Sequence, residues 1–437
     1  MVSGPALVLS GSLILWAALM RTLTGTWLQP GSFFAIFWCF AGIVPMILAP
    51  KDPVAPIAIA WLIAASVCMS LGAALGNRGF RSRHLVTPPG TTERELFILS
   101  SLLSIAIVLG MGSNVAFLKS SSLAFADLFD IQKLVVSSNQ AYFQRYAEAG
   151  APPPPVMSQA LLPFVYLAPA LGGIVFEIRR EKLWKLVGLA SFLPAVTVTI
   201  LQTTKAAVLF AMILWLSSYF ATRVRNGKLA VFTRAHVLVS VGAGGILTAF
   251  LFAVSLARLA STDLSLLNIV VGKLVSAAFG HMTVFSGWLS EYVKEPFNPS
   301  LGSVTFAGPL EMLGFSKRIP GLFESIVDLV TGETSNIYTG FRPLIQDFTI
   351  PGALLILTAV GFVGGVGFRR VAMGRWSAMP LLLIAYVTIF WSPITWFWIY
   401  NSLTATILAV ALIVVFVRIL RRVGGRNIQG DELAGTA

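Results

Sequence analysis

The sequence predicts an all-α polytopic membrane protein with about eleven transmembrane helices, and three observations support this class. The 437 residues are 56% hydrophobic and only 11% charged, whereas a soluble globular protein carries about 25% charged residues. The mean hydropathy is +0.83. The apolar residues also come in continuous runs, not in alternation, and these runs approach the roughly 20 residues that a helix needs to cross a hydrocarbon core.

We expect a single integral membrane domain over residues 1–437. The first apolar segment lacks a positively charged start and a small-residue cleavage signature, so it is interpreted as a retained helix. Cys39 and Cys68 both lie inside predicted spans, which predicts buried thiols and no disulfide framework. The predicted helices lie near 5–20, 32–49, 54–75, 95–112, 157–177, 186–204, 206–222, 236–257, 351–368, 377–395 and 402–417.

Charge placement predicts the orientation of these helices. Most basic residues fall on one side of the eleven-helix arrangement, and the positive-inside rule makes that side cytoplasmic. The net charge of +13 therefore reflects topology, and no basic stripe with interleaved aromatic residues indicates nucleic-acid binding. The clustered residues are Arg21, Arg78, Arg81, Arg83, Arg94, Arg179, Arg180, Lys182, Lys185, Arg223, Arg225, Lys228, Arg234, Arg369, Arg370, Arg375, Arg418, Arg421, Arg422 and Arg426.

Two hydrophilic loops remain for the external side, at 113–156 and 258–350. The second contains a fairly apolar region, 265–290, which is interrupted by polar residues and glycine. If this region were a single span, the basic pair at 369–370 would move outside, against the positive-inside rule. We therefore expect an interfacial or re-entrant helix within one large, partly helical external loop.

The most informative polar stretch lies at the end of this loop, over 336–352. It places Asn336, Tyr338, Arg342, Gln346 and Asp347 immediately before an apolar segment. Charged and amide groups at a membrane edge are costly unless they serve a function or are buried with partners. This stretch is therefore the leading candidate for a functional site.

Three motifs resemble a known family. Asn336-Ile-Tyr-Thr-Gly-Phe-Arg342 is followed by Asp347-Phe348, at the predicted outer end of a helix. About 30 residues upstream, the stretch from Leu301 to Glu311 contains Gly-Ser-Val-Thr-Phe, and Thr203-Thr-Lys205 lies at another helix end. Together with the topology, these motifs resemble the oligosaccharide repeat-unit polymerases, the O-antigen or Wzy-type polymerases of bacterial inner membranes. The chain departs from that pattern at Thr349, where glycine is usual, and at Lys205, where arginine is common.

The resemblance implies an architecture and an activity. The fold would be that of the GT-C-like glycan polymerases and ligases, in the bacterial inner membrane, with the large loop in the periplasm. The enzyme would transfer a growing glycan from one undecaprenyl diphosphate to the sugar of the next lipid-linked unit. Donor and acceptor are both lipid-linked, no cofactor is needed, and a chain-length regulator protein is a further partner.

The resemblance also implies roles for particular side chains. Fixed external cations would stabilise the diphosphate leaving group, and arginine suits this because its planar fork binds phosphate oxygens bidentately. The acceptor hydroxyl needs a general base. The substrate-binding candidates are Arg145, Lys205, Arg258, Arg318, Asn336, Tyr338 and Arg342, with Lys317 as a further external cation, and the catalytic candidates are Asp347, His281 and Glu311, with Glu291 as a further acid on the same side.

Structural interpretations of the same residues stay open. Arg342 and Asp347 are also consistent with an ion pair that ties the loop to the helix, and Lys205 with snorkelling to the interface. His281 is equally a candidate for a hydrogen-bonded structural histidine. The aromatic-rich stretch 390–400 is interpreted as an interfacial belt at an outer helix end.

The sequence predicts no metal site, because it has no Cys/His cluster. Two other functions remain as alternatives. One is an O-antigen ligase that transfers the finished glycan to the lipid A core. The other is a flippase or other transporter for a lipid-linked sugar, for which charges lining a cavity within the spans are expected.

Overall fold

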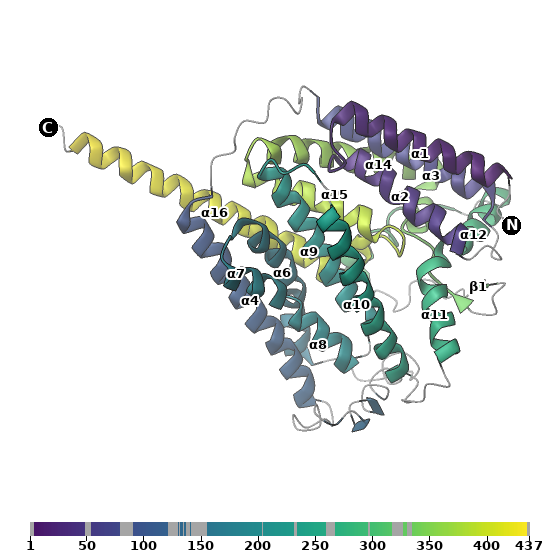
Figure 1. The fold of residues 1–437 in the computed structure, drawn as a ribbon, viewed down its shortest axis with the longest axis horizontal. Helices are drawn as coiled ribbons and strands as arrows, with labels where there is room; N and C mark the ends of the chain where they lie inside the picture. The colour runs from purple at the N-terminus through teal and green to yellow at the C-terminus, as the bar shows by residue number, and fades with distance from the viewer. Residues whose placement is uncertain are drawn as a thin grey trace.

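The computed structural model shows a chain built almost entirely of helices (Figure 1). In the described part, one antiparallel strand pair, β1 (Val327–Asp328) and β2 (Thr334–Ser335), is two residues long. The predicted helical membrane class is thus confirmed. The structure describes all residues except 1–3, 49–53, 79–90, 121–129, 131, 134, 137–139, 141–154, 203, 231–233, 259–266, 296–297, 317–326, 330–333 and 435–437.

The long helices pack in two neighbouring groups (Figure 1). One group contains α1 (Gly4–Thr24), α2 (Pro30–Leu48), α3 (Pro56–Gly76), α14 (Phe341–Ala372) and α15 (Met379–Trp391). The other contains α4 (Glu93–Ser120), α6 (Val156–Ile178), α7 (Lys182–Ala190), α8 (Leu193–Gln202) and α9 (Lys205–Arg225).

The last helix, α16, joins these two groups. It covers Asn401–Ala434 and contacts both α6 and α15, and its C-terminal part projects beyond the bundle (Figure 1). The remaining elements are α10 (Arg234–Arg258), α11 (Leu267–Phe279), α12 (His281–Lys294), α13 (Ala307–Met312) and the 3-10 turns η4 (Trp376–Ala378) and η5 (Phe397–Ile399).

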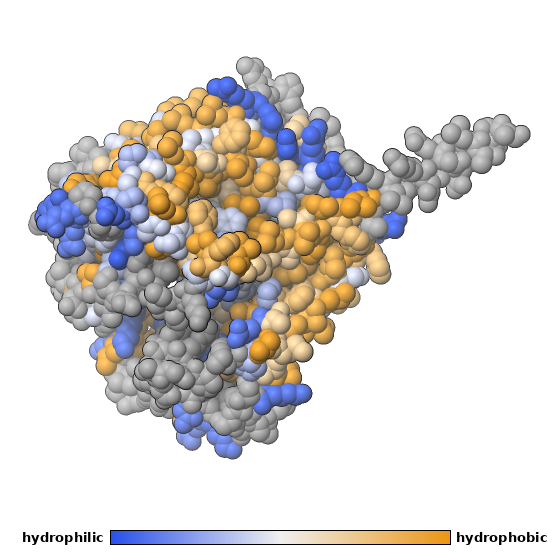
Figure 2. Space-filling model, turned by 180° about the vertical axis from the view of Figure 1, so that it is seen from behind, coloured by the Kyte–Doolittle hydropathy of each residue, from blue (hydrophilic) through white to orange (hydrophobic). Residues whose placement is uncertain are grey.

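Eight helices in the described part are long and apolar enough to cross a membrane, or nine if a bent helix pair counts as one span. Apolar side chains cover much of the coloured surface on the face shown in Figure 2, as expected for contact with lipid. All eleven predicted segments are helical, but the count of about eleven spans is not confirmed. The segments α1, α10 and α15 are not among the eight.

Glycines bring α3 and α14 to backbone contact. Gly72 and Gly76 lie four residues apart on α3, and Gly361 and Gly365 repeat that spacing on α14. A Cβ added at Gly361 would overlap the carbonyl oxygen of Met69. This is the close approach that small residues at four-residue spacing permit between membrane helices. It fixes α14, and therefore the polar stretch at its start, against the bundle.

Contacts between distant loops group the basic residues at one end of the molecule, here called the basic end. Arg369 Nη1 donates a hydrogen bond to the carbonyl oxygen of Arg78 at 2.8 Å. Lys228 Nζ lies 2.7 Å from Glu177 Oε1. These contacts join loops that the charge pattern places on the same side, so the predicted alternation of the spans is consistent with the packing. The assignment of this end to the cytoplasm stays a prediction.

The opposite end, here called the motif end, brings together 300–311, 336–347 and 391–401. Asn401 Nδ2 donates to Glu311 Oε2 at 2.8 Å. The backbone N–H of Gly340 donates to the carbonyl oxygen of Ser392 at 2.6 Å. Three segments that are widely separated in sequence therefore meet where the apolar segments of α14 and α16 begin.

The ambiguous region 265–290 forms two helices, α11 and α12, that break at Gly280 with a bend of 54°. Such a geometry is that of a broken span or a re-entrant loop, and the second is the form we expected. The pair belongs to the motif end, because α12 packs against α3 and α11 contacts β2.

The expected aromatic belt is wrong. Trp391, Trp396 and Phe397 are exposed by only 1%, 2% and 1%. Trp391 packs against Phe210 of α9, with ring centroids 4.1 Å apart. The stretch is apolar enough to face lipid, but these three rings are buried inside the protein.

Candidate functional site

The polar stretch begins as a turn and continues as the first turns of α14. Phe341 is fully buried, and its ring lies 4.8 Å from that of Trp38 and 5.7 Å from that of Trp61. Phe285 of α12 packs on it as well, at 5.8 Å. The start of α14 is therefore anchored to α2, α3 and α12, and the residue after Phe341 has a fixed position.

That next residue, Arg342, is held by aromatic rings. Its guanidinium carbon lies 3.8 Å from the ring centroid of Tyr338 and 5.4 Å from that of Trp288. Trp288 stacks in turn on Tyr292, with centroids 5.3 Å apart and planes 24° apart. Arg342 is half-buried. Cation–π contacts of this kind hold a guanidinium in place, and a guanidinium is the side-chain group best suited to bind a phosphate bidentately.

Asp347, five residues after Arg342, binds another segment of the chain. It is fully buried, and its carboxylate accepts hydrogen bonds from the hydroxyl of Ser300 and from the backbone N–H groups of Val304 and Thr305. The backbone N–H of Leu301 donates to the carbonyl oxygen of Asp347. The two motif-bearing stretches are thus joined through one carboxylate, and the geometry favours an anchoring role over that of a general base.

Unusual backbone conformations gather in the same place. In the described part of the chain, the non-glycine residues with positive φ are Leu301 (48°), Thr339 (66°) and Thr349 (63°). Thr349 combines this φ with a ψ of 176° and breaks α14 into two helical parts. This region of φ/ψ space is essentially restricted to glycine, and strained residues cluster at functional sites.

His281 is enclosed and not open to a substrate. It is 4% exposed, Nε2 lies 2.9 Å from the carbonyl oxygen of Ala41, and Nδ1 lies 3.1 Å from that of Ala278. Both ring nitrogens therefore face acceptors of the protein itself. This arrangement ties α12 to α2 and favours the structural interpretation of the histidine.

Of the two catalytic candidates that carry a carboxylate, Glu311 is the more exposed. It lies on α13, is half-buried, and is held by Asn401, the first residue of α16. The two carboxylates thus differ. Both oxygens of Asp347 accept hydrogen bonds from the 300–305 segment, whereas Oε2 of Glu311 accepts one from Asn401. Among the predicted bases, the geometry ranks Glu311 first.

The remaining predicted residues lie at different positions in the fold. Tyr338 is 2% exposed and belongs to the Arg342 site, whereas Asn336 is exposed beside it. Lys205 is the half-buried first residue of α9, and Arg258 is the last residue of α10. Arg145 and Arg318 lie outside the described residues.

Trp288 and Ser300 were not predicted from the sequence, although both contact predicted residues. Phe285, Trp288 and Tyr292 recur on one face of α12, and this helical spacing is the signal from which Trp288 could have been predicted. Within the described part of the chain, no group of three or more His, Cys, Asp or Glu residues is placed to hold a metal ion.

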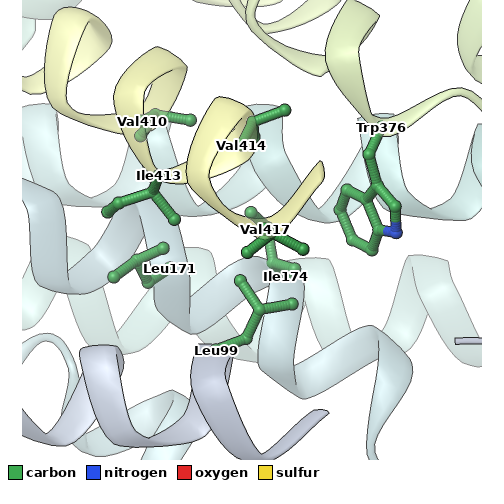
Figure 3. Close-up of a pocket in the computed structure, with 8 residues that line it drawn as sticks. All are labelled: Leu99, Leu171, Ile174, Trp376, Val410, Ile413, Val414 and Val417. Atoms are coloured by element: carbon green, nitrogen blue, oxygen red, sulfur yellow. The ribbon is translucent and has the colours of Figure 1, made fainter. Parts of the chain in front are cut away.

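A small apolar hollow lies elsewhere, between α4, α6, η4 and α16 (Figure 3). Its volume is about 10 Å³, and Ile413 of α16 lies opposite Leu171 of α6. It adjoins Trp376, over which Arg225 of the basic end lies. This hollow is a packing gap and does not belong to the motif end.

Comparison with known proteins gives no family for this chain. No protein-family model, curated protein or solved structure matches it. The function is therefore argued from the residues and from the geometry of the motif end.

Proposed function

We propose that this chain is a glycosyltransferase that polymerises undecaprenyl-diphosphate-linked oligosaccharide units at the periplasmic face of a bacterial inner membrane. The observation that carries the proposal is Arg342, held between Tyr338 and Trp288 at the motif end. A cation fixed at the end of an apolar helix suits a substrate whose diphosphate lies at the membrane surface and whose lipid tail lies in the bilayer.

In the proposed reaction, the acceptor sugar hydroxyl attacks the anomeric carbon of the donor glycan. A new C–O glycosidic bond forms while the bond between that carbon and the diphosphate oxygen breaks. The electron pair of the broken bond leaves with undecaprenyl diphosphate, and Arg342 stabilises the charge that develops there. The hydroxyl proton passes to a general base.

Glu311 is the proposed base. Its carboxylate is half-exposed, and the hydrogen bond from Asn401 orients it and leaves the other oxygen to receive a proton. Asp347 acts through the backbone, because it holds the 300–305 segment, and with it the start of α13, against α14. His281 supports α12, which carries Trp288.

Glycan analysis of a deletion strain tests the proposed function. Loss of the polymerase leaves single-repeat lipopolysaccharide or abolishes an exopolysaccharide, and complementation with the wild-type chain restores polymer. Accumulation of full-length lipid-linked polymer would instead identify a ligase. Accumulation of single lipid-linked units on the cytoplasmic face would identify a flippase, and an unaltered glycan would refute all three functions.

A further inference from the structure

Large apolar side chains are exposed at the motif end, outside the Arg342 site. Leu301 is 82% exposed, Leu313 69% and Phe315 76%, with Phe306 and Met312 partly exposed beside them. We call these five residues the α13 patch. Contiguous exposed apolar groups of this kind usually mark an interaction surface.

The patch is held in a defined conformation. Gly314 adopts φ +76° and ends α13, with its N–H donating to the carbonyl oxygen of Glu311 and the N–H of Phe315 donating to that of Leu310. This is the hydrogen-bond pattern of a Schellman cap. In such a cap the residue after the glycine usually packs back on the helix, whereas Phe315 projects outward.

The position of α13 along the spans is set by its contacts. Glu311 is bonded to Asn401, where the candidate span Asn401–Ile419 begins. At about 1.5 Å per residue, a span of this length matches the thickness of the hydrocarbon core, about 30 Å. Asn401, and therefore α13, lies at the boundary between hydrocarbon and headgroups. Leu301 lies in the turn before α13, and its backbone N–H donates to the carbonyl oxygen of Asp347 near the start of α14.

Two further features identify what covers the patch. The spans that begin at this end, α14 and α16, carry exposed apolar side chains, such as Leu355 (71%) and Leu412 (70%), as expected for contact with lipid. In the sequence, Lys317 and Arg318 follow Phe315 directly after one serine, and basic residues beside an apolar segment favour anionic headgroups.

We propose that the α13 patch inserts into the surface of the membrane leaflet at the motif end and anchors the 301–306 turn there. This anchor goes beyond the proposed glycan polymerisation and does not depend on it. Because the carboxylate of Asp347 accepts hydrogen bonds from the same turn, the anchor sets the depth of the candidate site relative to the lipid headgroups.

Site-directed fluorescence tests the anchor. Cys39 and Cys68 are the two cysteines of the chain, so Cys39→Ser and Cys68→Ser give a background without thiols. Leu313→Cys or Phe315→Cys is then labelled with an environment-sensitive fluorophore, with the exposed Asn336→Cys as the matched control at the same end. Quenching is measured in nanodiscs holding one copy, with nitroxide lipids labelled near the headgroup and with aqueous iodide.

The anchor predicts that probes at 313 and 315 are quenched by the shallow nitroxide and are several-fold less sensitive to iodide than the probe at 336. Equal iodide sensitivity at all three positions would overturn it. Protection from iodide without quenching by the nitroxide lipids would also overturn it, because the patch would then be covered by protein. The independent label at 313 is the control for the case in which the fluorophore at 315 protrudes from the surface without the patch.

Discussion

Arg342 owes its position to rings from two different parts of the chain, Tyr338 in the preceding turn and Trp288 on α12. A guanidinium held in this way loses less freedom on binding an oxyanion than a mobile side chain would. The residue is therefore the sharpest single test of the candidate site.

Arg342→Ala is expected to lower polymer output while leaving the protein in the membrane. Loss of a hydrogen bond to a charged group costs about 1.5–3 kcal/mol, or roughly 10–150-fold in rate if the contact is made in the transition state. Arg342→Lys should restore activity only in part, because lysine lacks the planar fork. Polymer is measured by gel analysis of extracted glycan, with the exposed Lys294→Ala of α12 as control. Wild-type output from Arg342→Ala would return this residue to a structural role.

Glu311→Gln is expected to reduce the transfer rate by about 10²–10⁴-fold, the usual contribution of a general base. Glutamine keeps an oxygen that accepts the hydrogen bond from Asn401, so folding should be preserved. Single-turnover transfer with purified protein measures the rate, and Glu291→Gln on an exposed part of α12 is the matched control. Equal losses in both variants would contradict a specific role for Glu311.

Thr349→Gly is expected to stabilise the protein. The φ of 63° and ψ of 176° at this position cost a β-branched residue about 1–3 kcal/mol, and glycine removes that strain at a backbone-entropy cost of about 0.5–1 kcal/mol. The thermal unfolding midpoint in detergent should rise. Thr349→Ala keeps a Cβ and serves as control, so an equal rise in both variants would show that the strain at this φ is not the cause.

At the scale of elements, the paired glycines of α3 and α14 decide where the polar stretch lies. Gly361→Leu should lower the thermal midpoint, since a Cβ at this position overlaps the backbone of Met69. Overpacking of this kind costs typically about 1–3 kcal/mol. Gly242→Leu on α10 is the control, because nothing lies within 4 Å of the Cβ position there. A midpoint that falls equally in both variants would indicate a general effect of leucine.

The break between α11 and α12 is a second element that shapes the site. A straight helix over the same residues would carry Trp288 along a different axis, whereas the 54° bend at Gly280 turns α12 against α3. His281, the first residue of α12, then fastens the bend to α2 through the carbonyl oxygen of Ala41. The bend and the ring contacts at Arg342 are therefore parts of one arrangement.

For the whole molecule, the proposed function predicts transfer without a metal ion. The lipid diphosphate is already an activated leaving group, and fixed arginine can provide the charge stabilisation that Mg²⁺ provides elsewhere. Purified protein in nanodiscs should polymerise undecaprenyl-diphosphate glycan in the presence of EDTA and without ATP or nucleotide sugar. Abolition by EDTA with recovery on Mg²⁺ or Mn²⁺ would make the acids Asp127, Asp130, Glu311 and Asp347 candidate ligands and reduce Arg342 to a supporting role.

The sequence by itself determined the helical membrane class, the position of every long helix and the polar stretch that forms the candidate site. These properties are local, because apolar runs of span length and polar residues at their ends can be recognised without knowledge of the tertiary contacts. The sequence also indicated a break near Gly280, because polar residues and glycine interrupt the apolar pattern there.

Only the tertiary structure decided how the candidate residues differ. Asp347 and Glu311 are both acids of the large loop in the sequence. In the structure, Asp347 is buried and accepts hydrogen bonds from the 300–305 segment, whereas Glu311 is half-buried and bonded to Asn401. Trp391 and Trp396 are apolar enough for lipid but are buried inside the protein. Such outcomes depend on contacts between residues tens to hundreds of positions apart, and no local pattern encodes which partner a side chain will meet.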